Sequence, residues 1–183
     1  MTPSRREVLA VAGASLVLVP FSKAADAAVR ADEAAISGET VAKLVRRSEL
    51  ANAALMRGDV DQYRVYVQTT GDFTLMAPFG GKPTRGYELT DERWEAVGRF
   101  FKNGDFEQEL IESYASSDLV VLVLIERSHV EVGGLSAQDW SLRVTLVYRR
   151  DGSQWLLAHR HADPLVKGVS LEQAAALTRG EMK

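Results

Sequence analysis

The segment from Trp140 to Leu165, WSLRVTLVYRRDGSQWLLAHRHADPL, constrains the fold more than any other part of the chain. Two runs of alternating apolar and β-branched residues flank the sequence RRDGS (149–153), which is typical of a β-hairpin turn. The second run carries His159 and His161, two of the three histidines in the protein. Because side chains alternate between the two faces of a strand, both imidazoles are predicted to share one face with Trp155. We expect that face to line the binding site.

Length and composition indicate one domain with short appendages. At 183 residues and 46% hydrophobic content, the chain can bury one substantial core. The formal net charge of −3 argues against nucleic acid as a partner. The lack of cysteine excludes structural disulfides, thiolate chemistry and a lipid anchor on cysteine. The sequence has no phosphate-binding glycine loop and no activated-serine motif, and no cofactor is expected.

Residues 1–27 have the pattern of a cleavable export signal. Arg5 and Arg6 precede the apolar run Ala10–Val19, and small residues ending at Ala27 supply a cleavage site. The arginine pair resembles the twin-arginine type of signal. The alternative is a single membrane anchor, but the apolar run is too short to span ~30 Å of hydrocarbon. We therefore expect a periplasmic or secreted protein that has no contact with the membrane after cleavage.

The mature chain divides into a linker (28–38), a folded domain (39–167) and a helical tail (168–183). Helices, predicted from apolar residues at three- and four-residue spacing, are expected at 39–57, 60–67, 90–101 and 170–176, with N-caps at Asp59, Thr90 and Ser170. Strands, predicted from period-two alternation, are expected at 73–77, 107–114, 119–125 and in the hairpin. Helices followed by a run of antiparallel strands predict an α+β fold with a curved sheet wrapped around the helices.

Three further motifs accompany the hairpin: Met56-Arg57-Gly58-Asp59 after the first helix, GDFTLMAPFGGKPTRGYE at 71–88, and a third helix containing Trp94. Together with RDGSQW and HRHADP of the hairpin, they resemble the nuclear transport factor 2-like superfamily over residues 40–166. The hairpin resembles the SnoaL-like branch, which is related to ketosteroid-isomerase-like proteins and to the association domain of calmodulin-dependent kinase. This resemblance implies a cone-shaped, strongly curved antiparallel sheet packed on three N-terminal helices, with an open-ended cavity and a homodimeric assembly.

The resemblance also allows particular activities to be tested. Ketosteroid isomerases have a general-base aspartate directly before the proline that matches Pro78, and here that position is Ala77. Alanine cannot accept a proton, so ketosteroid isomerisation is excluded. The kinase association domain has an arginine in its pocket at the position of Thr145, so this anion clamp is missing unless Arg143 replaces it.

The length of the hairpin turn decides whether Arg143 joins the histidines. A three-residue loop with a bulge places Arg143 and Thr145 on the same face as Trp155, His159 and His161. A two-residue loop places Arg143 on the opposite face. We favour the three-residue loop.

His159 and His161 are candidates for a general acid and base, because imidazole titrates near neutral pH. Asp163 is placed to orient His161. The alternative is that either histidine packs structurally, with its nitrogens bonded to the backbone. Asp72 is a third catalytic candidate, and its alternative role is to cap the start of the strand that follows it.

The spacing of the two histidines also suits a metal ion, because both imidazoles project in the same direction. A third ligand would have to come from His129, Asp72 or Glu126, and nothing in the spacing requires one. We expect no metal.

The candidate ligand-binding residues combine polar groups of the hairpin with an aromatic wall. They are Arg143, Thr145, Tyr63, Tyr66, Met76, Trp94 and Trp155, with Phe100 as a further wall residue. Such a cavity suits a small apolar or aromatic ligand. If the protein is an enzyme, we expect acid/base chemistry of the isomerase, hydratase/dehydratase or cyclase type, centred on His161. The alternative is a non-enzymatic dimeric assembly module whose interface is the outer face of the hairpin.

Overall fold

The computed structural model describes residues 23–181, so most of the predicted export segment (1–27) lies outside the described residues. The helices are α1 (Lys23–Met56), α2 (Val60–Tyr66), α3 (Asp91–Phe100) and α4 (Leu171–Thr178), with a short 3₁₀ helix at Gly86–Glu88. The strands are β1 (Thr69–Met76), β2 (Thr84–Arg85), β3 (Phe101–Lys102), β4 (Glu107–Ala115), β5 (Leu119–Val132), β6 (Leu135–Asp151) and β7 (Gln154–Pro164). The predicted α+β class is confirmed.

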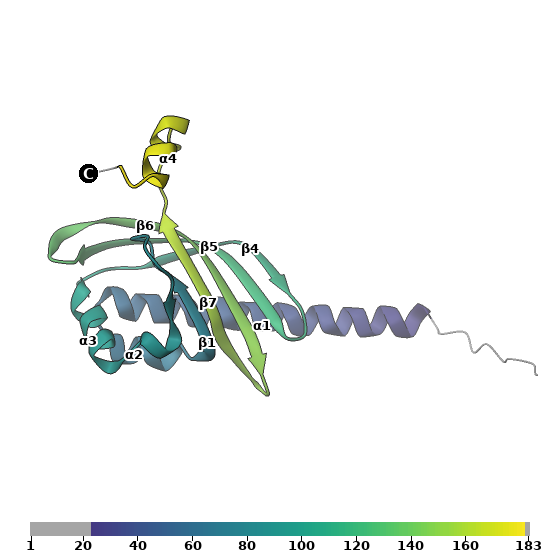
Figure 1. The fold of residues 1–183 in the computed structure, drawn as a ribbon. Helices are drawn as coiled ribbons and strands as arrows, with labels where there is room; N and C mark the ends of the chain where they lie inside the picture. The colour runs from purple at the N-terminus through teal and green to yellow at the C-terminus, as the bar shows by residue number, and fades with distance from the viewer. Residues whose placement is uncertain (1–22, 182–183) are drawn as a thin grey trace, which may run out of the picture.

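Seven strands form one curled sheet in the order β2-β1-β7-β6-β5-β3, with β4 paired to β5. The sheet curls around α1, while α2 and α3 lie together at one end, and this arrangement is the predicted cone (Figure 1). β5, β6 and β7 form a continuous antiparallel meander. The prediction of a purely antiparallel sheet is wrong in one place, because β1 pairs with β7 in parallel.

The predicted N-caps agree with the structure. The Asp59 carboxylate accepts a hydrogen bond from the backbone amide of Gln62 at 3.0 Å, and the Thr90 hydroxyl accepts one from that of Arg93 at 3.3 Å. Ser170 begins α4 with a reciprocal capping box. Each cap satisfies an amide that has no partner within the helix, which explains why these helices begin where the sequence indicates.

α1 begins earlier than the sequence pattern indicates. Its backbone is helical from Lys23, so the range 28–38, expected to be a linker, belongs to the helix. Alanine has the highest helix propensity, and this range is rich in it. At the other end, Gly58 adopts φ +84° and its amide donates to the Leu55 carbonyl at 2.9 Å, which ends the helix. Between residues 23 and 181, no helix combines the length and the apolar composition that a membrane span requires.

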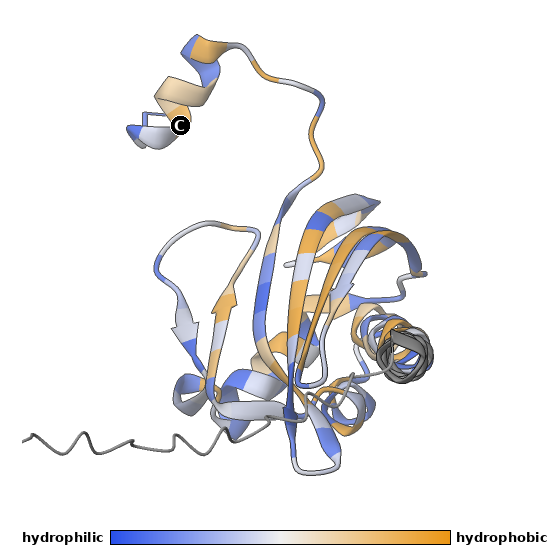
Figure 2. Ribbon diagram, turned by 90° about the vertical axis from the view of Figure 1, so that its right-hand side faces the viewer, coloured by the Kyte–Doolittle hydropathy of each residue, from blue (hydrophilic) through white to orange (hydrophobic). Residues whose placement is uncertain are grey.

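The inner face of the sheet packs against α1 to form the main core. Leu122, Leu124 and Leu146 are almost fully buried and alternate with residues of the outer face. Leu44 of α1 is buried in the same cluster, and Ala51, further along α1, is buried in a second cluster with Tyr63 and Val130. Burial of each large apolar side chain stabilises the fold by about 1.5–3 kcal/mol. Figure 2 shows the alternation of apolar and polar residues along the strands, and it shows α4 standing apart from this core.

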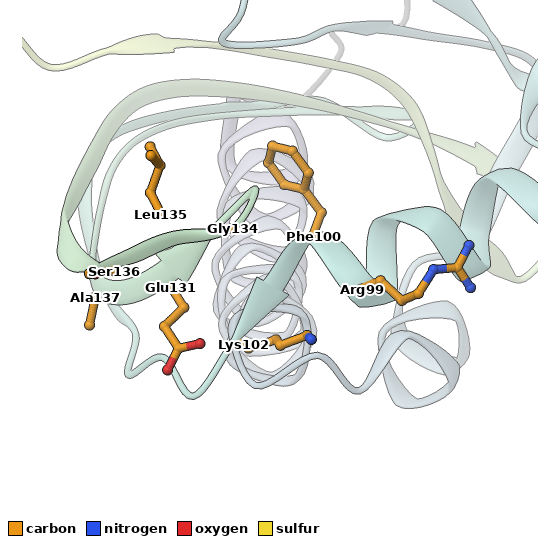
Figure 3. A pocket seen from close by; sticks show the side chains of 8 residues that line it. All are labelled: Arg99, Phe100, Lys102, Glu131, Gly134, Leu135, Ser136 and Ala137. Atoms are coloured by element: carbon orange, nitrogen blue, oxygen red, sulfur yellow. The ribbon is translucent and has the colours of Figure 1, made fainter.

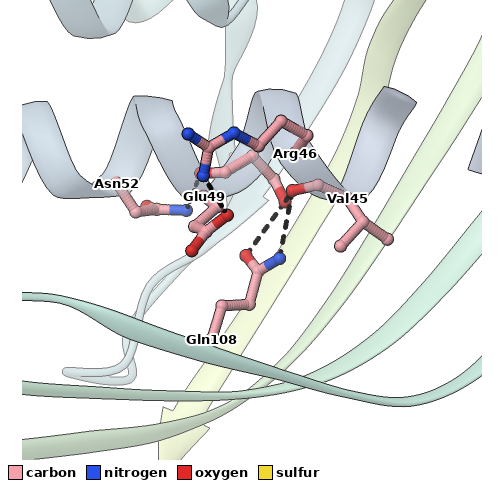
Figure 4. Close-up of polar contacts among 6 residues, drawn as sticks. Val45, Arg46, Glu49, Asn52 and Gln108 are labelled. Atoms are coloured by element: carbon pink, nitrogen blue, oxygen red, sulfur yellow. Dashed lines mark hydrogen bonds and ion pairs between the residues drawn. The ribbon is translucent and has the colours of Figure 1, made fainter. Parts of the chain in front are cut away.

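Polar side chains fix the orientation of α1 against the sheet. Gln108 of β4 donates to the Val45 carbonyl at 3.2 Å and accepts from the Ser48 hydroxyl at 2.9 Å (Figure 4). Buried polar groups need such partners, so this contact favours one rotation of α1 about its axis. In that rotation Asn52, one turn after Ser48, is directed at β5.

Candidate functional site

A β-bulge in β7 determines which hairpin residues face the interior of the cone. Tyr148 pairs with Leu157 and the preceding Val147 pairs with His159, so Ala158 has no partner on β6. A bulge inserts one residue and shifts the alternation of side chains by one. Leu157 is therefore buried on the inner face, whereas His159 lies on the outer face.

Beyond the bulge, Arg160 and Ala162 face the interior, and His159 and His161 face outward. Trp155, before the bulge, packs inward against the core. The prediction that both histidines share a face with Trp155 is therefore wrong. The physical reason is that the period-two alternation does not continue through β7.

The hairpin turn has two residues, Gly152 and Ser153, between the paired residues Asp151 and Gln154. Gly152 has φ +58°, the left-handed conformation that the first position of a type II′ turn requires. The favoured three-residue loop is therefore wrong. Arg143 nevertheless shares the outer face with the histidines, because the bulge in β7 changes the phase after the turn.

The polar candidates of the hairpin form a cluster on this outer face. Arg143 forms an ion pair with Asp163 at 2.6 Å (Nε to Oδ1), and His161 Nε2 lies 4.0 Å from the other oxygen of that carboxylate. Thr145 lies opposite His161 and lines a small hollow of about 190 Å³ with it. Arg143 therefore does not supply an anion clamp inside the cone.

His159 is engaged by a neighbouring strand. Its Nδ1 lies 2.6 Å from the Thr74 hydroxyl, and its ring centroid lies 6.4 Å from that of His161. Partial burial lowers the pKa of His159 below its ordinary value, which favours the neutral imidazole. This environment supports the alternative reading of His159 as a structural residue.

Four other predicted site residues do not line the cavity in the cone interior either. Asp72 is exposed and pairs with Arg149 at 2.7 and 3.1 Å; this hydrogen bonding lowers the pKa of Asp72 to about 2. Met76 lies on the outer face and is 42% exposed. Tyr66 borders a surface groove along α1, and Trp155 packs against the core. Asp72 is therefore not a base in the cavity.

The interior of the cone contains a cavity of about 480 Å³, within the range of ~300–1,000 Å³ that is typical of small-molecule sites. The walls come from α1, α2, α3, β1, β6 and β7 and are mostly apolar, including Phe73, Leu75, Val97, Phe101 and Leu142. Among the predicted wall residues, Tyr63, Trp94 and Phe100 line this cavity. Ala77, at the position of the isomerase base, lines it too.

A buried ion pair forms the polar end of the cavity. Arg160 lines the cavity and binds Glu126 of β5 at 2.6 and 2.9 Å, with side chains only 13% and 4% exposed. Asn52 of α1 donates to the same carboxylate at 3.1 Å. Both terminal nitrogens of Arg160 and both oxygens of Glu126 are engaged, so the two charges compensate each other.

The sequence alone did not predict Arg160 as a site residue, and it suggested Glu126 only as a candidate metal ligand. Glu126 follows the apolar run Leu119–Ile125, and alternation from the buried Leu124 places it on the inner face. A carboxylate at an inward position is a signal for a buried partner, because charged residues are almost never buried unpaired. Arg160 gave no comparable signal. If the alternation of β7 were unbroken, the histidines would face inward with Trp155, and Arg160 would lie on the outer face.

The groups in this cavity suit recognition better than proton transfer. Among the described residues, the titratable side chains that line it are Tyr63, Arg93 and Arg160. Burial raises the pKa of the Tyr63 phenol, so this hydroxyl keeps its proton near neutral pH, and a guanidinium group is a hydrogen-bond donor that proteins do not deprotonate. They can donate hydrogen bonds to a ligand but do not exchange protons readily.

Aromatic side chains and a cation surround the opening of the cavity. Phe79, in the segment between β1 and β2, is 60% exposed and lies 5.5 Å from Phe100 and 5.6 Å from Trp140, measured between ring centroids. Arg93 of α3 also lines the cavity and is exposed. Arg160, in contrast, is at the buried end, so the cavity runs from an exposed opening to a compensated ion pair.

A second hollow, of about 370 Å³, lies between the end of α3 and the β5–β6 hairpin. Figure 3 shows Arg99, Lys102 and Glu131 around it, with Arg99 extended away from Glu131, so the charged groups do not converge. Across residues 38–181, no three histidine, aspartate or glutamate side chains form a group that could hold a metal. His129, a candidate third ligand, lies 3.0 Å from Asp139 instead.

Neither a protein-family model nor a curated protein matches this sequence. Solved structures do match. A nuclear transport factor 2-like (NTF2-like) protein from Salmonella enterica is 13% identical, with a TM-score of 0.56 over 73% of this chain and 94% of that one. A candidate dehydratase of the NTF2-like family from Streptomyces avermitilis is 20% identical, with a TM-score of 0.53 over 67% and 96%.

The association domain of calcium/calmodulin-dependent protein kinase II from C. elegans also matches, at 14% identity and a TM-score of 0.51 over 69% of this chain and 97% of that one. Identities this low establish a shared fold and do not transfer an activity. The TM-scores above 0.5 over most of each matched chain show that this chain has the NTF2-like fold.

Proposed function

We propose that this protein binds a small apolar or aromatic molecule in the cone cavity. The observation that supports the proposal is the cavity of about 480 Å³, which apolar side chains line and which ends at the compensated Arg160–Glu126 pair. A ligand that fills the cavity removes apolar surface from water. Tyr63 and Arg160 supply hydrogen bonds that orient a polar atom of the ligand.

Binding fits the side chains of the cavity better than acid/base catalysis does. His161, the predicted acid/base residue, lies on the outer face with 47% of its side chain exposed. The word dehydratase describes the Streptomyces avermitilis protein, and only the shared fold connects that description to this chain. Proton transfer on a bound substrate therefore ranks second to binding.

Titration with phenylnaphthylamine, a neutral aromatic dye that fluoresces in apolar surroundings, tests the binding proposal. We expect saturable binding at one site, which Ala77→Trp abolishes by filling the cavity. Trp94→Ala is expected to weaken binding at least about five-fold, because buried aromatic contacts dominate such sites. Tyr87→Ala is the matched control, since Tyr87 is 82% exposed and does not line the cavity. Unchanged binding in Ala77→Trp would contradict the proposal.

We also propose that residues 1–27 direct export by the twin-arginine route. The support is the order of Arg5-Arg6, the apolar run Ala10–Val19 and the small residues before Ala27. Replacing both arginines by lysine is expected to keep the uncleaved chain inside the cell, as measured by fractionation and immunoblotting. Arg46→Lys is the control, because Arg46 is exposed in the folded domain. Continued export of the double-lysine variant would contradict this route.

A third proposal concerns assembly: the outer face of the sheet pairs with that of a second copy of this chain. Val121, Val123 and Ile125 of β5 lie on that face, and Ile111 and Tyr114 of β4 are 52% and 62% exposed. Apolar patches of this kind mark interaction surfaces. The likeness to a kinase association domain supports an oligomer in general. A molar mass measured by light scattering should be twice that of one chain, and the mass of a single chain at all concentrations would contradict the proposal.

A further inference from the structure

We propose that the ligand is an anion: a molecule with an apolar body and one carboxylate or sulfonate group, bound with its acidic group at Arg93. This inference rests on the proposed function of the cavity. It adds the charge of the ligand and the direction in which the ligand enters.

Arg93 is a cation at the cavity opening whose contacts are all with neutral groups. Its Nη2 donates to the Thr84 hydroxyl at 3.3 Å, and its Nη1 donates to the Glu88 carbonyl oxygen at 3.5 Å. Both contacts are long for hydrogen bonds, and neither partner carries a negative charge in its accepting atom. Arg93 takes part in none of the ion pairs among the described side chains. Arg93 therefore retains its hydrogen-bonding capacity for an anion.

The neighbouring arginines differ from Arg93 in this respect. Arg64 and Arg99, on α2 and α3, each lie within ion-pair distance of a carboxylate, at 3.0 and 3.6 Å. Arg160, at the inner end of the cavity, is held by Glu126. Of the two arginines that line the cavity in the described part of the chain, Arg93 is the one without a counter-charge.

These charges determine the direction in which an anion binds. At the inner end, an anion would compete with Glu126 for Arg160, and it would lose its water beside side chains that are 4% and 13% exposed. Burying a charge without a free partner is strongly unfavourable. At the opening, Arg93 is exposed, so an anion there keeps part of its hydration while it gains the attraction of the guanidinium. The acidic group therefore points outward.

The surroundings of Arg93 place an apolar body next to the anion. Trp94 follows Arg93 in α3 and lines the cavity, with its ring 5.7 Å from that of Tyr63. Thr84, which contacts Arg93, lies on the paired strand β2. Trp94 and Thr84 both belong to regular secondary structure, so the distance between the anion-binding position at Arg93 and the apolar wall is fixed.

Two dyes with the same ring system test this inference. Anilinonaphthalene sulfonate carries a sulfonate, and phenylnaphthylamine is the same molecule without it. Arg93→Gln is expected to weaken binding of the sulfonate about five-fold, the ratio that corresponds to ~1 kcal/mol, and to change binding of the neutral dye less than about two-fold. Arg99→Gln removes the same charge from the same helix outside the cavity and is expected to change neither dye beyond about two-fold.

The outcomes separate this inference from the proposed function. Equal weakening of the sulfonate by Arg93→Gln and Arg99→Gln would overturn the inference, because it would show general attraction by a positive surface. Weakening of both dyes by Arg93→Gln would also overturn it, because Arg93 would then be part of the wall only. If Ala77→Trp abolishes the binding of neither dye, the proposed function fails, and this inference fails with it.

Discussion

The substitution Glu126→Leu is expected to destabilise the protein by about 3–5 kcal/mol, the usual effect of removing one partner of a buried ion pair. The Glu126 side chain is 4% exposed and that of Arg160 is 13% exposed. Leucine leaves the guanidinium without a counter-charge in a site that water scarcely reaches. It also removes the acceptor of the Asn52 amide, which lies 3.1 Å from the carboxylate. Both effects act in the same direction.

This loss is large but measurable. A domain of this size unfolds with a free energy of roughly 5–15 kcal/mol, so the variant remains folded at low temperature. Each kcal/mol lowers the melting temperature of such a domain by about 2–4 °C, so the expected decrease is on the order of 10 °C. Urea denaturation followed by circular dichroism gives the free energy, and calorimetry gives the melting temperature.

A double-mutant cycle isolates the ion pair from other effects. Arg160→Met alone leaves the carboxylate unpaired, and it is expected to destabilise about as much as Glu126→Leu. The double variant is expected to recover most of the loss, because neither charge is then buried alone. Asp72→Asn breaks the exposed pair with Arg149 and serves as the matched control, with a much smaller expected effect. Additive losses, or a loss in Glu126→Leu no larger than in the control, would refute the reasoning.

Three further predictions concern the outer face and the core. Burial lowers the pKa of His159, so NMR should show that this histidine titrates below the ordinary value of ~6.5. The free energy of unfolding should therefore decrease as the pH falls below ~6.5, because the unfolded state then binds the proton more readily. Titration of His159 at or above ~6.5 would contradict this environment. Val123→Arg on the outer face should reduce the molar mass from that of a dimer to that of one chain, and an unchanged mass would exclude this face as the interface. Gly104→Ala should destabilise by about 1–3 kcal/mol, since a Cβ there would lie 2.7 Å from Val130, whereas Gly71→Ala, with open space around it, serves as the control in the same denaturation experiment.

The elements that the sequence predicts well are those with a local physical cause. The N-cap residues Asp59, Thr90 and Ser170 determine where α2, α3 and α4 begin. Each of these caps can be recognised in the sequence from a single residue type at the start of the helix. The apolar run Leu119–Ile125 predicts the central strand β5 for the same reason. The parallel pairing of β1 with β7 had no such signal, because it joins segments far apart in the chain. The SnoaL-like branch rests on the hairpin sequence alone and stays a prediction.

The site was harder to predict because one unpaired residue decides it. Ala158 has no sequence feature that marks a bulge, yet it turns His159 and His161 outward and directs Arg160 inward. A period-two pattern gives the faces of a strand only up to the first irregularity. Tyr63 of α2 and Trp94 of α3 do line the cavity, and the regular spacing of a helix has no such irregularity, but their role in ligand binding stays a prediction.

NMR mapping of phenylnaphthylamine binding tests most directly that the cone interior, and not the histidine face, is the binding site. In the isotope-labelled protein, the indole N–H of Trp94 and the methyl groups of Leu142 should shift on addition of the dye, because both residues line the cavity. The signals of Thr145 and His161 on the outer face should remain unchanged. Shifts at Thr145 and His161, with Trp94 and Leu142 unaffected, would contradict the account.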